Sequence, residues 1–129
     1  MKFVPRQLTA ELKSAAEAFP ALIVTGPRRA GKTTLLRKVF PKAEYFLLED
    51  PDLIARFRAD PKGFIDEIDP PAILDEIQYL PEVLNYLRTL IDARPERKGQ
   101  WFLTGTLISD LLLLWLDPRI RLEGRDTAN

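Results

Sequence analysis

A run of residues early in the chain has the types and spacing needed to hold a triphosphate. Residues 26–33 read Gly-Pro-Arg-Arg-Ala-Gly-Lys-Thr and satisfy the pattern G-x-x-x-x-G-K-[ST] at every fixed position. Such a loop wraps its backbone N–H groups around a phosphate only if glycines permit unusual dihedrals and a close approach. The predicted phosphate-binding loop consists of Gly26, Pro27, Arg28, Arg29, Ala30, Gly31, Lys32, Thr33 and Thr34.

Two residues of this loop have specific expected contacts. The Lys32 ammonium is expected to reach the β- and γ-phosphate oxygens, and the Thr33 hydroxyl is expected to be a ligand of Mg²⁺. The alternative is that the two glycines only form a tight turn. An apolar run over residues 21–25 and a helical pattern over residues 32–40 flank the loop. They provide the strand before and the helix after that the motif requires, and they favour phosphate binding.

A pair of carboxylates follows a second apolar run. Ala72-Ile73-Leu74-Asp75-Glu76 has the form of a Walker B strand. Asp75 is expected beside the Mg²⁺, through a water molecule, because this ion prefers an oxygen-rich shell. Glu76 is expected to polarise the attacking water as a general base. The alternative is that both are surface residues that cap the next helix, predicted to start at Pro81.

Three more polar residues are candidates for the same site. Thr106 follows the fourth predicted strand, where P-loop ATPases with a catalytic glutamate place a residue called sensor 1 that contacts the γ-phosphate or the water. Thr104 is the second candidate for this role, and a threonine that merely closes a strand is the alternative. Gln78 is a weaker candidate for a contact with the water or with a neighbouring strand.

The arginines allow two interpretations. Any one of them would serve as an arginine finger, but a solvated surface position is the favoured interpretation for each. The candidates inside the loop and near the end of the chain are Arg28, Arg29, Arg119, Arg121 and Arg125.

The elements alternate between strand and helix patterns. Helices are predicted over residues 6–19 and 32–40, after Asp50-Pro51 and Asp60-Pro61, and from Pro81. Strands are predicted over residues 21–25, 44–48, 71–75 and 100–105, with residues 120–123 as a possible fifth strand. This order predicts an α/β fold: a three-layer P-loop core with a mostly parallel sheet and helices on both faces. We expect a single domain over residues 1–129, with its core at about 21–116 and a weakly patterned tail at 117–129.

Composition excludes several classes of site. Lys and Arg number 19, as do Asp and Glu, so net charge does not indicate a nucleic-acid partner. The chain has no Cys and no His, which excludes disulfides, thiolate or imidazole metal ligands and a histidine base. The nearly apolar stretch 107–116 is too short to cross a bilayer and is interpreted as a core helix. We expect a soluble, cytoplasmic protein with no membrane contact.

Four segments together resemble a known family. Residues 26–36, 48–52, 73–78 and 102–105 are similar to the prokaryotic AAA-type ATPases of the archaeal-ATPase-like group. The resemblance extends from about Arg6 to Gly105. It implies ATP and Mg²⁺ as cofactors and an arginine-bearing helix before the P-loop. Members of this group usually carry a second, C-terminal domain, and we expect this chain to be a truncated or stand-alone ATPase core without it.

Two features near the end of the chain bear on this resemblance. The family commonly has Ser where this chain has Thr106, and the hydroxyl is kept. The pair Gly124-Arg125 is similar to a Gly-Arg pair that the family places after sensor 1.

The leading functional hypothesis is Mg²⁺-dependent ATP hydrolysis that drives a conformational or regulatory change, with self-association or a protein partner left open. ATP is preferred to GTP because the guanine-reading motif Asn-Lys-x-Asp is absent. Two alternatives remain: an ATP-dependent binding switch with little turnover, and a small-molecule kinase. A kinase would normally add an arginine-rich lid, and no clear lid is found in the sequence.

Overall fold

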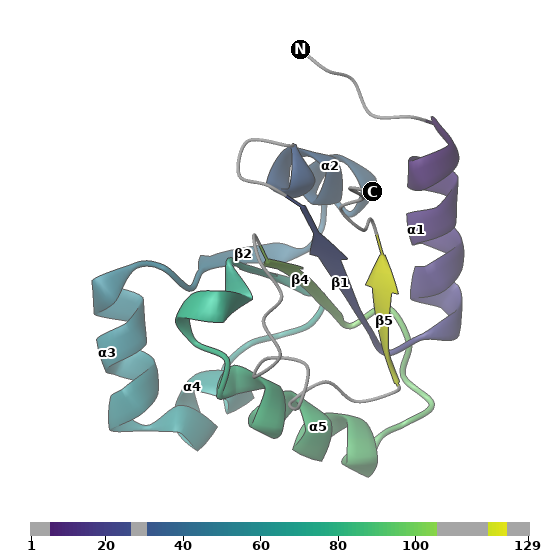
Figure 1. Ribbon diagram of the computed structural model, residues 1–129. Helices are drawn as coiled ribbons and strands as arrows, with labels where there is room; N and C mark the ends of the chain where they lie inside the picture. Colours follow the sequence, from purple (N-terminus) through teal and green to yellow (C-terminus); the bar gives the residue numbers. More distant parts are fainter. Residues whose placement is uncertain (1–5, 27–30, 106–118, 124–129) are drawn as a thin grey trace.

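A five-stranded parallel sheet forms the centre of the computed structural model, which describes residues 6–26, 31–105 and 119–123. The strand order is β2-β3-β4-β1-β5, and each neighbouring pair is parallel (Figure 1). The strands are β1 Ala21–Thr25, β2 Glu44–Leu47, β3 Ala72–Asp75, β4 Trp101–Gly105 and β5 Ile120–Glu123. The predicted parallel α/β architecture is therefore confirmed, and residues 120–123 do form a fifth strand.

Helices cover both faces of this sheet (Figure 1). They are α1 Arg6–Ala18, α2 Lys32–Val39, α3 Pro51–Ala59, α4 Pro61–Asp66, α5 Val83–Ala93 and a 3₁₀ turn, η1 Ile77–Tyr79. Helices α1 and α2 pack on one face, and α3, α4 and α5 pack on the other. The structure thus has the three layers expected of a P-loop core.

Successive residues of β1 point to opposite faces, and both faces are buried. Ile23 belongs to the core under α3, α4 and α5, whereas Leu22 and Val24 belong to the core under α1 and α2. The same alternation holds in β3, where Leu74 and Ile73 lie in different cores. Burial on both sides explains why these strands appear in the sequence as unbroken apolar runs.

Local signals define where α3 and α4 begin. The Asp50 side chain accepts a hydrogen bond from the N–H of Asp52 at 2.9 Å, and Asp60 accepts one from Gly63 at 3.1 Å. Each aspartate caps a helix whose first residue is proline, as the sequence predicts. Helix α5 begins at Val83 rather than at Pro81, because residues 81 and 82 form a turn that follows η1. The predicted core helix over residues 107–116 lies outside the described residues.

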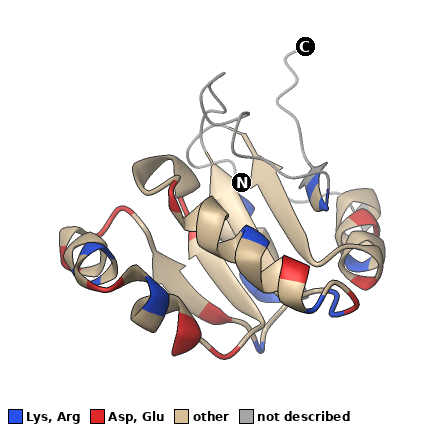
Figure 2. Ribbon diagram, turned by 90° about the horizontal axis from the view of Figure 1, so that it is seen from below, with Lys and Arg blue, Asp and Glu red and all other residues tan. Residues whose placement is uncertain are grey.

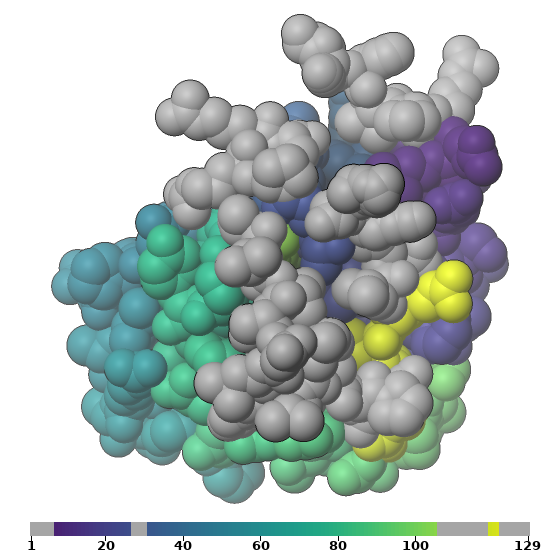
Figure 3. All heavy atoms as spheres, in the orientation of Figure 1, coloured from purple at the N-terminus to yellow at the C-terminus, as the bar shows by residue number. Residues whose placement is uncertain are grey.

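The surface of the described part is mixed in charge. Figure 2 shows Lys and Arg interspersed with Asp and Glu over the helices and loops. In the space-filling view α3, η1 and α5 form a continuous surface (Figure 3), and Arg58 of α3 lies 2.9 Å from the carboxylate of Glu82. Among the described residues, none of the helices has the length and apolar character needed to cross a membrane.

Candidate functional site

The register of the sheet brings the described candidates that follow β1 and β3 to one edge. Thr25, the last residue of β1, is opposite Gly105 of β4, and Leu74 of β3 is opposite Leu103. The carboxyl ends of β1, β3 and β4 therefore meet where the predicted phosphate-binding loop leaves β1. Ligands of open α/β sheets bind at this edge.

The two fixed glycines of the loop have backbone conformations that suit glycine. Gly26 has φ 152° and Gly31, which caps α2, has φ 86°. L side chains rarely adopt a positive φ, so these two positions require glycine for conformational reasons. Pro27, Arg28, Arg29 and Ala30 lie outside the described residues, and their phosphate-binding role stays a prediction.

Lys32 joins the two ends of the loop. Its side chain is buried, with 7% exposed, and Nζ donates a hydrogen bond to the carbonyl oxygen of Gly26 at 2.8 Å. Gly26 in turn donates its N–H to the carbonyl of Gly105 at 3.2 Å. The ammonium group is thus held at the carboxyl end of β1, where a bound phosphate would be expected. Thr34, the last residue of the predicted loop, lies exposed in the first turn of α2.

The carboxylate of Asp75 accepts hydrogen bonds from three hydroxyl groups. Thr33 Oγ1 donates to Oδ1 at 2.8 Å, Thr104 Oγ1 donates to Oδ1 at 2.5 Å, and the Tyr45 phenol donates to Oδ2 at 2.5 Å. These donors come from α2, β4 and β2. The structure therefore brings together the two predicted metal ligands, Thr33 and Asp75, which are far apart in the sequence.

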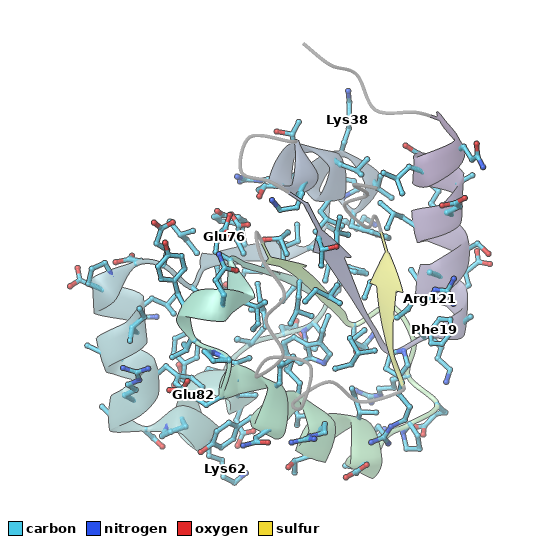
Figure 4. The ribbon with its side chains drawn as sticks, in the orientation of Figure 1. Phe19, Lys38, Lys62, Glu76, Glu82 and Arg121 are labelled. Carbon is cyan, nitrogen blue, oxygen red and sulfur yellow. The ribbon has the colours of Figure 1, made fainter. Side chains whose placement is uncertain are left out.

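Glu76 has an unusual backbone conformation immediately after β3. Its φ of 64° and ψ of 62° lie in the left-handed region, which typically costs about 1–3 kcal/mol for a residue other than glycine. Its N–H donates to Thr104 Oγ1 at 2.8 Å, and its Oε1 accepts a hydrogen bond from the Gln78 amide at 2.7 Å. Figure 4 shows Glu76 above η1, at the edge of the sheet toward which β1 points. Strain of this kind is concentrated at functional sites.

Thr104 has a structural role that the sequence analysis missed. Its side chain is fully buried, and its hydroxyl donates to Asp75 and accepts from the Glu76 N–H. These bonds turn the Thr104 hydroxyl inward, toward the carboxylate residues. Thr106, the first candidate for sensor 1, lies outside the described residues and remains a prediction.

Tyr45 was not predicted as a site residue. Tyr45 is opposite Ile73 in the β2–β3 pair, and Ile73 precedes Asp75 by two positions. The side chains of Tyr45 and Asp75 therefore lie on the same face of the sheet. The Arg37 guanidinium lies 4.4 Å from the centre of the Tyr45 ring. Burial, the hydrogen bond to Asp75 and the negative charge of Asp75 raise the pKa of the Tyr45 phenol above its usual value of 10.0. Tyr45 could be identified only from the order of the strands in the sheet, which the sequence does not show.

The chemistry of the donor set fits Mg²⁺. A hydroxyl and a carboxylate are hard oxygen donors, the kind that this ion prefers. Within the described ranges, no group of three or more His, Cys, Asp or Glu residues is arranged to hold a metal. A site with only Thr33 and Asp75 leaves the remaining positions to water and phosphate oxygens, which suits an ion that keeps several waters.

The described arginines of the tail lie far from this edge. Arg119 forms an ion pair with Asp92 of α5 at 2.6 Å, and the Arg121 guanidinium lies 5.7 Å from the ring of Phe19 (Figure 4). Ile120, between them, is opposite Ala21, the first residue of β1. Both arginines are therefore near the amino end of β1. Arg28, Arg29 and Arg125 lie outside the described residues.

Comparison with known sequences identifies the family. Residues 18–125 match the profile of a family described as AAA domain. The chain belongs to this AAA domain family. The predicted resemblance to AAA-type P-loop ATPases is confirmed at this level.

Two curated relatives of this AAA domain come from mycobacteria. They are the uncharacterized proteins Rv2008c of Mycobacterium tuberculosis and Mb2031c of Mycobacterium bovis, each 35% identical over 109 residues. The match covers 83% of this chain but only 24% of each relative. The chain thus spans about a quarter of the length of these relatives.

Solved structures share the fold of this AAA domain at low sequence identity. AMPPCP-bound DnaA from Aquifex aeolicus has a TM-score of 0.60 and 15% identity, covering 95% of this chain and 47% of DnaA. PCH-2 of C. elegans has a TM-score of 0.51 and 18% identity, covering 95% of this chain and 41% of PCH-2.

Proposed function

We propose that this AAA domain binds ATP together with Mg²⁺ and hydrolyses the terminal phosphoanhydride bond, and that hydrolysis drives a conformational or regulatory change. The observation that carries the proposal is the 2.8 Å contact between Thr33 Oγ1 and Asp75 Oδ1, with Glu76 as the next residue. The hydroxyl comes from the helix that follows the loop and the carboxylate from the end of β3. Hydrolysis of ATP requires two such groups, a hydroxyl and a carboxylate, side by side to hold Mg²⁺.

Each residue has one task in this proposal. The loop Gly26–Thr34 holds the phosphates through its N–H groups, and Lys32 exchanges its bond to the Gly26 carbonyl for one to the phosphate oxygens. Thr33 and Asp75 hold Mg²⁺, which when bound neutralises the negative charge that develops on the phosphate oxygens. Glu76 accepts the proton of the attacking water, and Thr106 contacts the γ-phosphate or that water.

Two observations support ATP as the nucleotide. The structural neighbour DnaA was solved with AMPPCP bound. The guanine-reading motif Asn-Lys-x-Asp does not occur in the sequence. A second cationic side chain at the γ-phosphate, in addition to Lys32, would come from the loop arginines, from Arg125 or from another protein chain. Arg119 and Arg121 lie near the amino end of β1, away from this position.

The experiment that tests the proposal is phosphate release from radiolabelled ATP by the purified chain, with Mg²⁺ or with EDTA. Release that requires Mg²⁺ is the expected result. Bound ATP without release would favour a binding switch, and transfer of the label to an added small-molecule acceptor would favour a kinase. Either result would overturn hydrolysis as the function.

A further inference from the structure

The Tyr45 phenol occupies a position on Asp75 that a metal ion would otherwise be free to use. An ionised carboxylate has about four lone-pair sites, two on each oxygen. Oδ1 accepts from Thr33 at 2.8 Å and from Thr104 at 2.5 Å, and Oδ2 accepts from Tyr45 at 2.5 Å. The donors among the described residues leave one lone pair of Oδ2, enough for a water molecule bound to a metal.

The phenol is held firmly in this position. The ring packs with the core beneath α1 and α2, and the Arg37 guanidinium lies 4.4 Å from its centre. Arg37 is one turn beyond Thr33 in α2, so the same face of that helix supplies the hydroxyl to Oδ1 and the cation above the ring. Direct coordination of a metal by Oδ2 would require this anchored phenol to move or to share the oxygen.

We propose that Tyr45 is a specificity-determining residue that keeps Asp75 a water-mediated partner of the metal and thereby makes the site select Mg²⁺ over Ca²⁺. Mg²⁺ gives up its waters reluctantly and tolerates a carboxylate that is reached through water. Ca²⁺ takes six to eight oxygen ligands and gains from direct, often bidentate, carboxylates. A carboxylate whose oxygens already accept hydrogen bonds from hydroxyl groups therefore weakens the binding of Ca²⁺ more than that of Mg²⁺.

The inference rests on the proposed function, because it requires that nucleotide and metal bind at this edge of the sheet. It is tested by equilibrium binding of AMPPCP, measured by calorimetry, while MgCl₂ or CaCl₂ is titrated. The quantity of interest is the ratio of the Ca²⁺ and Mg²⁺ concentrations that half-saturate nucleotide binding. Hydrolysis does not enter this measurement.

In Tyr45→Phe we expect the ratio of the Ca²⁺ to the Mg²⁺ concentration to fall about tenfold, because Ca²⁺ binds relatively better. This is the lower end of the effect on metal affinity of removing a residue that hydrogen-bonds to a metal ligand. The matched control is Tyr86→Phe, because Tyr86 packs against Phe57 on the opposite face of the sheet. The control is expected to keep the parent ratio.

An unchanged ratio in folded Tyr45→Phe would overturn the inference. Circular dichroism establishes folding first. If Tyr45→Phe does not fold, Arg37→Leu takes its place, because it loosens the ring without removing a donor to Asp75, and an unchanged ratio in that variant would overturn the inference equally. If the parent chain does not bind AMPPCP in the presence of MgCl₂ or of CaCl₂, the proposed function is refuted instead, so the two failures are distinguishable.

Discussion

The Thr104 hydroxyl lies 2.8 Å from the backbone nitrogen of Glu76 and 2.5 Å from Oδ1 of Asp75. One buried side chain thus fixes both residues: it holds the carboxylate of Asp75 and the strained backbone of Glu76. Because the left-handed conformation of Glu76 is unfavourable by itself, this bond helps to hold the turn that presents the glutamate.

The first prediction concerns this bridge. Thr104→Val keeps the shape of the side chain but leaves the buried N–H of Glu76 without its acceptor, which should lower the free energy of unfolding by about 1–3 kcal/mol. Thr104→Ser retains the hydroxyl and should recover much of that loss. Urea unfolding of the three chains measures the effect. Equal stability of the valine variant and the parent would show that the bridge contributes nothing.

Gln78 gives a second prediction. Its amide donates to Glu76 Oε1 at 2.7 Å, a charge-assisted bond that fixes the direction of the carboxylate. Gln78→Leu should leave ATP affinity near that of the parent and lower kcat by about 10-fold or more, since such bonds contribute roughly 1.5–3 kcal/mol. Gln7→Leu, at an exposed position on α1, is the control. An unaltered kcat in Gln78→Leu would exclude a positioning role.

A third prediction concerns nucleotide binding. Lys32→Ala removes the ammonium group at the end of β1 and should weaken ATP binding by at least about tenfold, because charge-assisted contacts to phosphate are among the strong ones. Lys38→Ala is the matched control: Lys38 lies on the same helix, but its side chain is exposed and extends away from the sheet (Figure 4). Calorimetry that gives Lys32→Ala the affinity of the parent would contradict the phosphate-binding assignment.

Stability at high pH gives a fourth prediction. The folded chain raises the pKa of Tyr45 above 10.0, so it holds the phenolic proton more tightly than the unfolded chain does. The stability that this contributes is complete below the unfolded pKa and is lost as pH rises from there toward the folded value. The stability of the parent relative to Tyr45→Phe should therefore stay constant up to about pH 9 and fall as the pH rises from about 10 to about 11. A difference that stays constant over this range in urea unfolding would contradict the prediction.

The sequence predicts the parts of the site that are encoded locally. The loop glycines, Lys32 and Thr33 lie in one motif, and Asp75 and Glu76 follow one apolar run, so residue type and spacing are enough to name them as candidates. In the structure Thr33 and Asp75 are in contact, which follows from the parallel order of β1, β4 and β3. The roles of these residues in catalysis remain predictions.

The partners that position the carboxylates were not predictable in this way. Tyr45 reaches Asp75 only because β2 pairs with β3, and Thr104 does so only because β4 lies on the other side of β3. This strand order differs from the order along the chain, so no local pattern reveals it. The left-handed backbone of Glu76 was hidden for a different reason: glutamate is not a residue type that signals a positive φ.

The most direct test of the account is the effect of Glu76→Gln on binding and on chemistry, measured on the same protein. Glutamine keeps the shape of the side chain but cannot accept the proton of water, and general base catalysis is typically worth about 10²- to 10⁴-fold. Glu67→Gln, an exposed position that follows α4, serves as the control. The account predicts near-parent ATP affinity for Glu76→Gln and a fall in hydrolysis within that range. Hydrolysis by Glu76→Gln at the rate of the parent would show that the catalytic base lies elsewhere.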